Sequence, residues 1–352
     1  MSDKIRVGVV GTSWWSDHFH LAKLKGHAGV DLIAVCGRNR TRAEEMAAKH
    51  AIPQVYSDYQ EMIARANLQA LVVATPDDLH YPITMAALEA GLHVLCEKPL
   101  AQHLFQARAM LEKAQAVGVK HMVCFTYRWN PVHRYLKHLL EEGYIGRCYQ
   151  INIRFMGGMA INYSWRFDKK RSNGSLGEMG SHMVDLARWF MGDIVQVNGH
   201  LTTFANQTGP DGQPLDSAND AATVALRFAN GAQGVIQLSA VAQVGNVGNH
   251  QDMILCGEEG TLELKYDTRV GGELRGIRRG EDNFQTIEIP QEFWGANVPF
   301  DVFKITTADQ SFIDSILYDR AAEPTFLNGY KVQQVIDAAV QSDQQGKWVS
   351  IE

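Results

Sequence analysis

The first 125 residues alternate short apolar runs with segments of helical periodicity, and no other feature of the sequence constrains the fold as strongly. This alternation is typical of a parallel sheet with helices on both faces. We therefore predict a doubly wound α/β domain over residues 1–125. Its strands are expected at Ile5–Val10, Asp31–Cys36, Ala70–Ala74, His93–Cys96 and His121–Phe125.

Three of the helices between these strands have recognisable start signals, and the one that ends before Gly91 can be capped by Asp77 or Asp78. Thr41 is followed three residues later by Glu44, and Ser57 by Gln60, which is the spacing of a capping box. Because such a side chain accepts a hydrogen bond from a free backbone N–H group of the first turn, we expect Thr41 and Ser57 to cap these helices.

Beyond the first domain the strands become longer and alternate polar with apolar residues, as in Tyr149–Phe155 and Asp220–Ala242. The Asn230-Gly231 pair favours a two-residue hairpin turn. A chain of 352 residues with 45% hydrophobic content is too long for one ordinary core. We therefore predict a second, C-terminal α+β domain over residues 126–352 with a large, mostly antiparallel open sheet.

The composition excludes several classes of partner and site. A formal net charge of −6 without a Lys/Arg cluster argues against nucleic acid or an anionic membrane as a partner. There is no apolar run long enough for a membrane span and no leader pattern, so we expect a cytoplasmic protein. The five cysteines are never spaced as Cys-x-x-Cys, and no His-x-x-x-His pattern occurs, so neither a disulfide framework nor a metal is predicted.

The turn after the first strand resembles a dinucleotide-binding fingerprint in which Gly11, Ser13 and Ser16 stand at the three glycine positions. Serine is small enough for the backbone to approach a pyrophosphate at the helix N-terminus. Taken alone, the motif fits an ordinary strand-to-helix turn equally well. The surrounding strand-helix-strand pattern favours the nucleotide interpretation.

No carboxylate follows the second strand, where an acidic residue would hold the ribose 2′-hydroxyl of NAD. Arg38, with Arg40 or Arg42, could instead pair with a 2′-phosphate, which favours NADP(H) over NAD(H). The alternative is that these arginines are solvated charges of a first helical turn. Cations gain nothing from the helix dipole there, and this placement supports a bound anion.

Several motifs of the chain closely resemble those of the glucose-fructose oxidoreductase, inositol dehydrogenase and MocA-type family (Gfo/Idh/MocA). The triplet Glu97-Lys98-Pro99 is the most specific of them. The resemblance runs through the first domain and into the second. Its motifs lie at residues 74–80, 90–100, 127–131, 165–168 and 174–189.

The resemblance implies an N-terminal Rossmann domain, a C-terminal domain for substrate binding and oligomerisation, and a substrate cleft between them. It implies an NAD(P)-dependent oxidoreductase that moves a hydride between nicotinamide and a hydroxyl or keto carbon of a sugar, a cyclic polyol or a sugar derivative. It also implies a homo-dimer or homo-tetramer formed through the C-terminal sheet. The identity of the substrate and the direction of the reaction stay open.

The family's catalytic lysine corresponds to Lys98, which would polarise the substrate oxygen at the carboxyl end of a predicted strand. The family's histidine corresponds to His182, the expected general acid/base. Four residues earlier, Glu178 stands where the family has aspartate, and this departure puts the role of its carboxylate in doubt. Asp185 could orient the imidazole or merely be solvated.

The resemblance also implies binding residues, to which Arg38 and Arg42 are added from the charge pattern. Trp165 could instead belong to an inter-domain core, and Arg128 to a salt bridge at the domain interface. The expected substrate residues are Lys98, Tyr127, Arg128 and His182; the expected cofactor residues are Gly11, Thr12, Ser13, Trp14, Trp15, Arg38, Arg42, Thr75, Pro76, His80, Glu97, Trp165 and Arg166.

A second class of function is a sensor or regulator of the same fold that binds a nucleotide or sugar without turning it over. The serines of the nucleotide turn and Glu178 are compatible with it. The retained Lys98 and His182 favour the enzyme, because a sensor has no need of a group that transfers a proton during hydride transfer.

Overall fold

The computed structural model describes residues 4–160, 163–245, 248–294 and 306–351. The chain divides into two compact units, which we describe separately. The first unit contains residues 1–125 and 307–333, and the second contains residues 126–306 and 334–352. The boundary after Phe125 lies where the sequence pattern changes, but that pattern did not indicate the return of residues 307–333 to the first unit.

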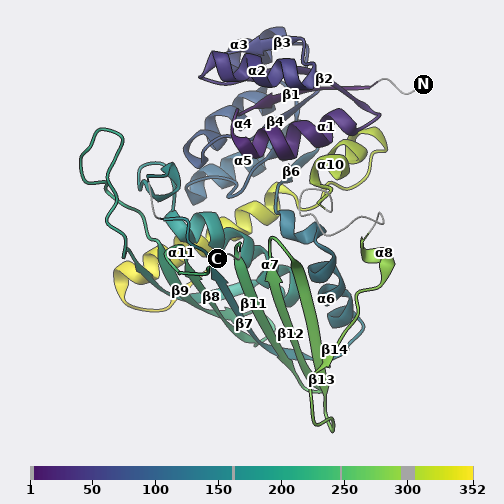
Figure 1. The fold of residues 1–352 in the computed structure, drawn as a ribbon, viewed down its shortest axis with the longest axis vertical. Coiled ribbons are helices and arrows are strands. Elements are labelled where there is room, and N and C mark those ends of the chain that lie inside the picture. Colours follow the sequence, from purple (N-terminus) through teal and green to yellow (C-terminus); the bar gives the residue numbers. More distant parts are fainter. Residues whose placement is uncertain (1–3, 161–162, 246–247, 295–305, 352) are drawn as a thin grey trace. The chain divides into compact units, whose positions relative to one another are not determined.

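The first unit is built on a six-stranded sheet of order β3-β2-β1-β4-β5-β6, in which every neighbouring pair is parallel (Figure 1). The predicted doubly wound sheet is therefore confirmed. The strand β3 was not predicted, because it is a half-buried edge strand of three residues without an apolar run. The strands are β1 (Ile5–Val10), β2 (Val30–Cys36), β3 (Gln54–Tyr56), β4 (Ala70–Val73), β5 (His93–Cys96) and β6 (His121–Val123).

The helices of the first unit follow the strands and cover the sheet. All four residues of β4 are fully buried, as expected for a parallel strand covered on both faces. The helical segments are η1 (Ser16–Leu21), α1 (Ala22–Gly26), α2 (Arg40–His50), α3 (Tyr59–Arg65), η2 (Asp77–Leu79), α4 (His80–Glu89), α5 (Leu104–Val117), α10 (Ala308–Leu317) and the first part of α11 (Phe326–Gln345).

The predicted helix caps are wrong. The N-cap position of α4 is Leu79, which makes no side-chain cap hydrogen bond, so neither Asp77 nor Asp78 stands there. The caps predicted at Thr41 and Ser57 are also displaced. The side chain of Asn39 accepts from the backbone N–H of Arg42, and that of Asp58 accepts from those of Gln60 and Glu61. The caps therefore lie two residues earlier for α2 and one residue later for α3. Asn and Asp are at least as favourable at this position as Ser and Thr, and here they occupy it in place of the neighbouring hydroxyl residues.

The returning segment joins the first unit through its backbone as well as its side chains. The N–H of Val123 donates to the carbonyl of Pro324 at 2.9 Å, and the N–H of Phe326 donates to Nδ1 of His121 at 3.1 Å. At Gly329, an added Cβ would lie 2.8 Å from side-chain atoms of Leu100 and Val123. Because glycine has no Cβ, α11 can pack this closely against β6.

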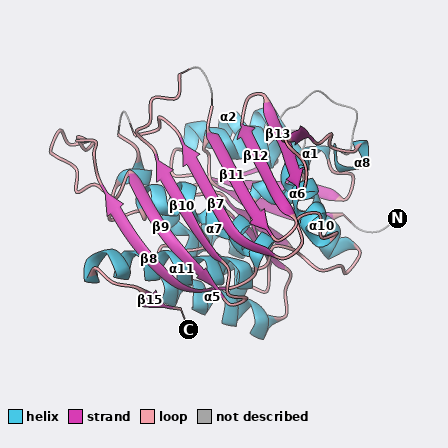
Figure 2. Cartoon of the chain, turned by 90° about the horizontal axis from the view of Figure 1, so that it is seen from below, coloured by secondary structure: helices cyan, strands magenta, loops and turns pink. Residues whose placement is uncertain are grey.

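The second unit contains a nine-stranded sheet of order β14-β13-β12-β11-β7-β10-β9-β8-β15 (Figure 2). All neighbours are antiparallel except β7 and β10, which confirms the predicted mostly antiparallel sheet. The strands are β7 (Cys148–Met156), β8 (Ile194–Thr202), β9 (Ala221–Phe228), β10 (Gln233–Ser239), β11 (His250–Gly257), β12 (Gly260–Asp267), β13 (Gly271–Arg278), β14 (Gln285–Thr286) and β15 (Val349–Ser350).

Helices cover one face of this sheet. In β7, Ile151, Ile153 and Phe155 are buried, whereas the residues between them are more exposed. The period of two places the apolar residues beneath the helices. The helical segments of this unit are η3 (Thr126–Trp129), α6 (Pro131–Glu141), η4 (Trp165–Phe167), η5 (Leu176–Gly180), α7 (Ser181–Met191), α8 (Gln291–Trp294) and the last part of α11.

The predicted two-residue turn between β9 and β10 is one residue too short. The N–H of Phe228 donates to the carbonyl of Ala232 at 2.9 Å, so three residues, 229–231, form the loop. Gly231 has a φ of +85° and closes it. A turn followed by a left-handed glycine is the usual form of a three-residue hairpin loop.

Within the described ranges, none of the helices combines the length and the apolar character needed to cross a membrane.

Candidate active site

The turn after β1 can be formed only by a glycine at position 11. Gly11 has a φ of +131°, and an added Cβ would lie 2.1 Å from the carbonyl oxygen of Ala74. Next to it, Thr12 approaches the end of β2, where a Cβ on Gly37 would lie 2.4 Å from the Thr12 side chain. The predicted nucleotide turn thus lies tightly between the ends of β2 and β4.

The two serines of the turn stabilise it. The hydroxyl of Ser16 donates to the carbonyl of Gly11 at 2.8 Å, and the N–H of Ser16 donates to Oγ of Ser13 at 3.0 Å. Helical conformation begins at Trp14, directly after the turn. The first N–H groups of a helix have no partner within the helix and favour an anion, so the turn fits a pyrophosphate.

A buried polar atom after β4 also fits a bound dinucleotide. Oγ1 of Thr75 is buried, and among the residues that the structure describes it has no hydrogen-bond partner. Thr75 follows Ala74, whose N–H donates to the carbonyl of Val10 at the end of β1. An unmade hydrogen bond costs free energy, which a ligand at this edge of the sheet would recover.

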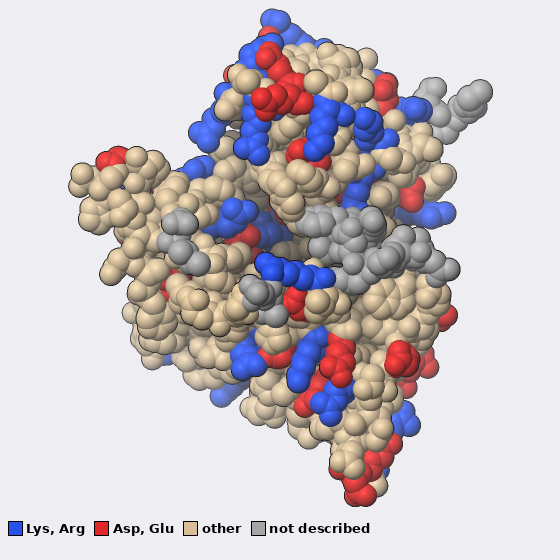
Figure 3. Space-filling model, viewed as in Figure 1, with Lys and Arg blue, Asp and Glu red and all other residues tan. Residues whose placement is uncertain are grey.

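The end of β2 presents arginines in different situations. Arg38 and Arg42 are exposed, whereas Nε of Arg40 donates to Oε1 of Glu44 at 2.8 Å. Arg42 and the capping Asn39 line a surface cleft of about 500 Å³, whose other lining residues include basic Lys49 and acidic Asp17 and Glu45. On the face of the first unit drawn in Figure 3, acidic side chains lie among the basic ones. This face therefore has no extended basic patch.

The loop after β5 contains Glu97, Lys98 and Pro99, and the Lys98–Pro99 peptide is cis. Glu97 is 8% exposed, and its carboxylate is hydrogen-bonded to Trp15, His20 and the backbone of Lys98. Oε1 accepts from Nε1 of Trp15 at 2.6 Å and bonds Nε2 of His20 at 3.0 Å, and Oε2 accepts from the N–H of Lys98 at 3.1 Å. Trp15 and Glu97, two predicted cofactor residues, are thus in direct contact.

Burial alone would raise the pKa of Glu97, but the hydrogen bond and charge of His20, with the charge of Lys98, lower it to about 2. Glu97 is therefore a carboxylate at neutral pH. Sequence reasoning did not find His20, because a single histidine five residues after Trp15 has no recognisable spacing.

His80 holds two loops of the site together. Its ring is fully buried, with Nδ1 2.8 Å from the carbonyl oxygen of Pro99 and Nε2 3.0 Å from that of Thr75. Burial lowers the pKa of His80, which favours the neutral ring, and a neutral ring donates to one carbonyl at a time. His80 therefore contacts the chain itself and connects the loops after β4 and β5.

In the second unit, Glu178 and His182 lie on consecutive helical segments. Glu178 lies in the π-helical turn η5 and His182 in the first turn of α7, so the segment that was expected to be helical is helical. The ring of Tyr127 meets that of His182 edge-on, with centroids 4.7 Å apart. Tyr127 is 7% exposed, and burial raises its pKa well above the ordinary value.

Two ion pairs organise the remaining predicted residues of this unit. Nε of Arg166 lies 3.1 Å from Oε1 of Glu178, and the guanidinium lies 4.6 Å from the Trp165 ring centroid. Arg128 donates to both carboxylate oxygens of Asp185, at 2.8 and 2.6 Å, and the Asp185 side chain is 1% exposed. Asp185 is therefore buried in a pair with Arg128 inside the second unit, and not solvated.

Two family models match the chain. Residues 5–125 match the model described as "Oxidoreductase family, NAD-binding Rossmann fold", and residues 133–263 match the "GFO/IDH/MocA C-terminal domain". The chain belongs to the Gfo/Idh/MocA family. It is accordingly an oxidoreductase, as the resemblance implied.

Named relatives and solved structures agree with this membership. Levoglucosan dehydrogenase of Pseudarthrobacter phenanthrenivorans is 29% identical over 89% of this chain and 87% of that protein. The scyllo-inositol 2-dehydrogenase (NADP(+)) IolU of Bacillus subtilis is 31% identical over 81% of this chain and 83% of that protein. A structure of levoglucosan dehydrogenase in complex with NADH and levoglucosan superposes with a TM-score of 0.90, at 26% identity over 99% of this chain and 100% of that chain.

Proposed function

We propose that this oxidoreductase uses NADP(H) in preference to NAD(H) and acts on a hydroxyl or keto carbon of a sugar, a cyclic polyol or a sugar derivative. The observation that carries the proposed reaction is the position of Lys98, two residues past the end of β5 in the unit that matches the NAD-binding family model. The preference for NADP(H) rests on the exposed Arg38 and Arg42 and on the lack of a carboxylate between Cys36 and Arg42. Relatives named for levoglucosan and scyllo-inositol support a polyhydroxylated ring as the substrate class.

The chemistry divides between two side chains. The nicotinamide supplies or accepts the hydride when the cofactor is bound. We assign stabilisation of the substrate oxygen to the Lys98 ammonium group, which favours a developing alkoxide by roughly a few kcal/mol in a dry site. We assign proton transfer at the same oxygen to His182, because imidazole titrates near neutral pH.

Three further residues of the second unit complete the proposed catalytic and substrate set. Glu178 would act as a carboxylate held by Arg166, beside the helical turn of His182. A guanidinium has five N–H donors, and the two bonds of Arg128 to Asp185 leave others that can reach a substrate hydroxyl. Tyr127 would present its ring beside His182.

The cofactor residues are proposed to act in two ways. Residues of the turn, the arginines after β2 and Thr75 would contact the dinucleotide, whereas Glu97 and His80 would hold the loops that surround it. The full proposed set is Gly11, Thr12, Ser13, Trp14, Trp15, Arg38, Arg42, Thr75, Pro76, His80, Glu97, Trp165 and Arg166.

The test is a screen of cyclic polyols, anhydrosugars and free sugars with NADP⁺ and NAD⁺, followed by nicotinamide absorbance. Lys98→Ala and His182→Ala should each lower turnover of the best substrate by about 10²-fold or more, with cofactor affinity retained. Lys120→Ala, which removes a lysine paired with Asp319, and His200→Ala, which removes an exposed histidine, are the matched controls. Turnover at the control level in either test variant would overturn the role proposed for that residue.

We further propose that the protein is a homo-dimer or homo-tetramer assembled through the sheet of the second unit. The helices cover one face of that sheet, and on the other face Ile254 of β11 is 37% exposed. A sheet face with apolar residues is stabilised by being covered. Sedimentation equilibrium tests the proposal, and a monomer at micromolar concentration would contradict it.

A further inference from the structure

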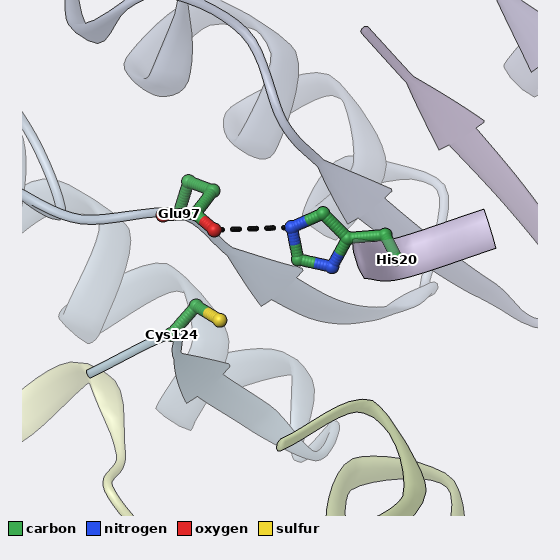
Figure 4. Close-up of side chains that lie close together, drawn as sticks. All are labelled: His20, Glu97 and Cys124. Atoms are coloured by element: carbon green, nitrogen blue, oxygen red, sulfur yellow. Dashed lines mark hydrogen bonds and ion pairs between the residues drawn. The ribbon is translucent and has the colours of Figure 1, made fainter. Parts of the chain in front are cut away.

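Three buried charged side chains form a chain of contacts within the first unit. Nδ1 of His20 lies 2.8 Å from Oδ1 of Asp309, and Nε2 of His20 lies 3.0 Å from Oε1 of Glu97. The side chains of His20 and Asp309 are 0% exposed. Figure 4 shows the imidazole of His20 directed at the Glu97 carboxylate. These contacts link α10, η1 and the loop after β5.

With both carboxylates ionised, the geometry favours a doubly protonated imidazole. A carboxylate oxygen faces each ring nitrogen of His20, and ionised carboxylates only accept hydrogen bonds. A neutral imidazole has one N–H and would leave one of the two buried carboxylates without its donor. An imidazolium donates to both and compensates one of their two negative charges.

Glu97 also contacts the nucleotide turn and the backbone of Lys98, the parts of the unit that we assign to cofactor binding and catalysis. Trp15, in the first helical turn after the nucleotide turn, donates to the same oxygen as His20. The other oxygen accepts the backbone N–H of Lys98. One carboxylate therefore fixes where the main chain of Lys98 lies relative to the nucleotide turn.

A metal ion is a poorer explanation of the same cluster. Nitrogen, oxygen and sulfur atoms of His20, Glu97 and Cys124 lie within 4.8 Å of one another. A metal needs a lone pair on the imidazole, but both nitrogens of His20 already face carboxylates. Burial raises the pKa of the Cys124 thiol well above its ordinary value, so it is a neutral thiol beside the ion pair.

We propose that His20 and Asp309 are positioning residues for Lys98, acting through the Glu97 carboxylate. The inference rests on the proposed function, because it assumes that Lys98 acts on the substrate oxygen. Asp309 holds the imidazolium, the imidazolium holds Glu97, and Glu97 holds the backbone of Lys98. Without Asp309 or the His20 imidazolium, the Lys98 ammonium group would move away from the substrate oxygen.

The test is a double-mutant cycle in the full-length protein, measured as the single-turnover rate of the nicotinamide absorbance change. His20→Gln and Asp309→Asn should each lower the rate about tenfold to a hundredfold, since displacements near 1 Å have effects of this size. In the Lys98→Ala background, the same two changes should lower the remaining rate less than twofold, while the midpoint of thermal unfolding still falls. A purely structural role would give the same loss of rate in both backgrounds, and that result would overturn the proposal.

The chain offers a matched control between the same parts of the unit. Nε2 of His27, at the end of α1, lies 3.2 Å from Oδ1 of Asp314 on α10. Asp314 lies on the same helix as Asp309 and is likewise bonded to a histidine, but no contact of the His27–Asp314 pair with Glu97 is found among the described residues. Asp314→Asn removes the charge of this pair. Its single-turnover rate should equal that of the wild type, and a loss as large as that of Asp309→Asn would also overturn the proposal.

The outcomes separate this inference from the proposed function. Wild-type turnover in Lys98→Ala would reject the role of Lys98 itself. A large loss in Lys98→Ala together with wild-type rates in His20→Gln or Asp309→Asn would reject only the positioning role. If His20→Gln does not fold, Asp309→Asn decides alone, because it preserves the side-chain volume and can still accept a hydrogen bond from His20.

Discussion

Arg166 and Glu178 form an ion pair in the second unit, with Nε and Oε1 3.1 Å apart. Glu178 stands four residues before His182, where the family pattern has aspartate. The Glu178 carboxylate contacts Arg166, whose guanidinium also lies over the Trp165 ring. Glu178, which departs from the family pattern, thus has an ion-pair partner in Arg166.

Glu178→Gln should lower kcat/KM about tenfold or more, because Arg166 loses the charge that holds it and a small displacement suffices. The free energy of unfolding should change by less than about 1 kcal/mol, since the Arg166 side chain is 38% exposed and such pairs contribute little. Steady-state kinetics and urea titration measure the two effects. Glu178→Asp keeps the charge and should retain more activity than Glu178→Gln; the reverse order would contradict this role for the carboxylate.

Arg38→Ala should weaken NADPH binding about tenfold or more and leave NADH binding unchanged, because only NADPH has a 2′-phosphate for the guanidinium. Fluorescence titration with both cofactors measures the difference. Arg40→Ala is the control, since Arg40 is paired with Glu44. Equal affinities for NADPH and NADH that do not respond to Arg38→Ala would remove the argument for NADP(H).

Gly11→Ala should destabilise the nucleotide turn, because its φ of +131° is unfavourable for alanine and its Cβ would lie 2.1 Å from the Ala74 carbonyl oxygen. We expect a cost of about 1–3 kcal/mol in unfolding free energy and at least tenfold weaker cofactor binding. Gly91→Ala is the matched control, with a φ of +75° and no atom within 4 Å of the added Cβ. Gly91→Ala should lose stability without losing cofactor affinity, and unchanged cofactor affinity in Gly11→Ala would place the dinucleotide elsewhere.

The buried contacts of His20 with Asp309 and Glu97 should make the free energy of unfolding depend on pH. Burial alone would lower the pKa of His20, but Asp309 and Glu97 raise it from 6.5 to about 10. The contribution of His20 is therefore complete below pH 6.5 and is lost as the pH rises through 10. The lowered pKa of Glu97 has the opposite effect, since its contribution is present above pH 4.5 and is lost as the pH falls through 2.

We expect the free energy of unfolding of the wild type to fall between pH 6.5 and 10, and this fall to be smaller in Asp309→Asn. Urea titration at a series of pH values measures both slopes. Asp314→Asn should keep the wild-type slope above pH 6.5. Equal slopes in the wild type and Asp309→Asn would mean that His20 is not held as an imidazolium.

Local pattern was sufficient for much of the fold. The strands β1 and β5 begin and end at the predicted residues, because each is a short apolar run between turns. Where the local signal is weak or shared, prediction failed: β3 has no apolar run, and Asn39 competes with Thr41 for the same cap. The hairpin loop after Phe228 needed one more residue than its Asn-Gly pair suggested.

The sequence alone determined the doubly wound sheet and placed Glu97-Lys98-Pro99 at the end of one of its strands, since both are properties of contiguous residues. Only the tertiary structure decided what holds that motif. Its partner His20 lies 77 residues from Glu97, and Asp309 lies 289 residues from His20. Which side chains meet across such separations depends on how the returning residues 307–333 pack against the sheet, and no local periodicity specifies that packing.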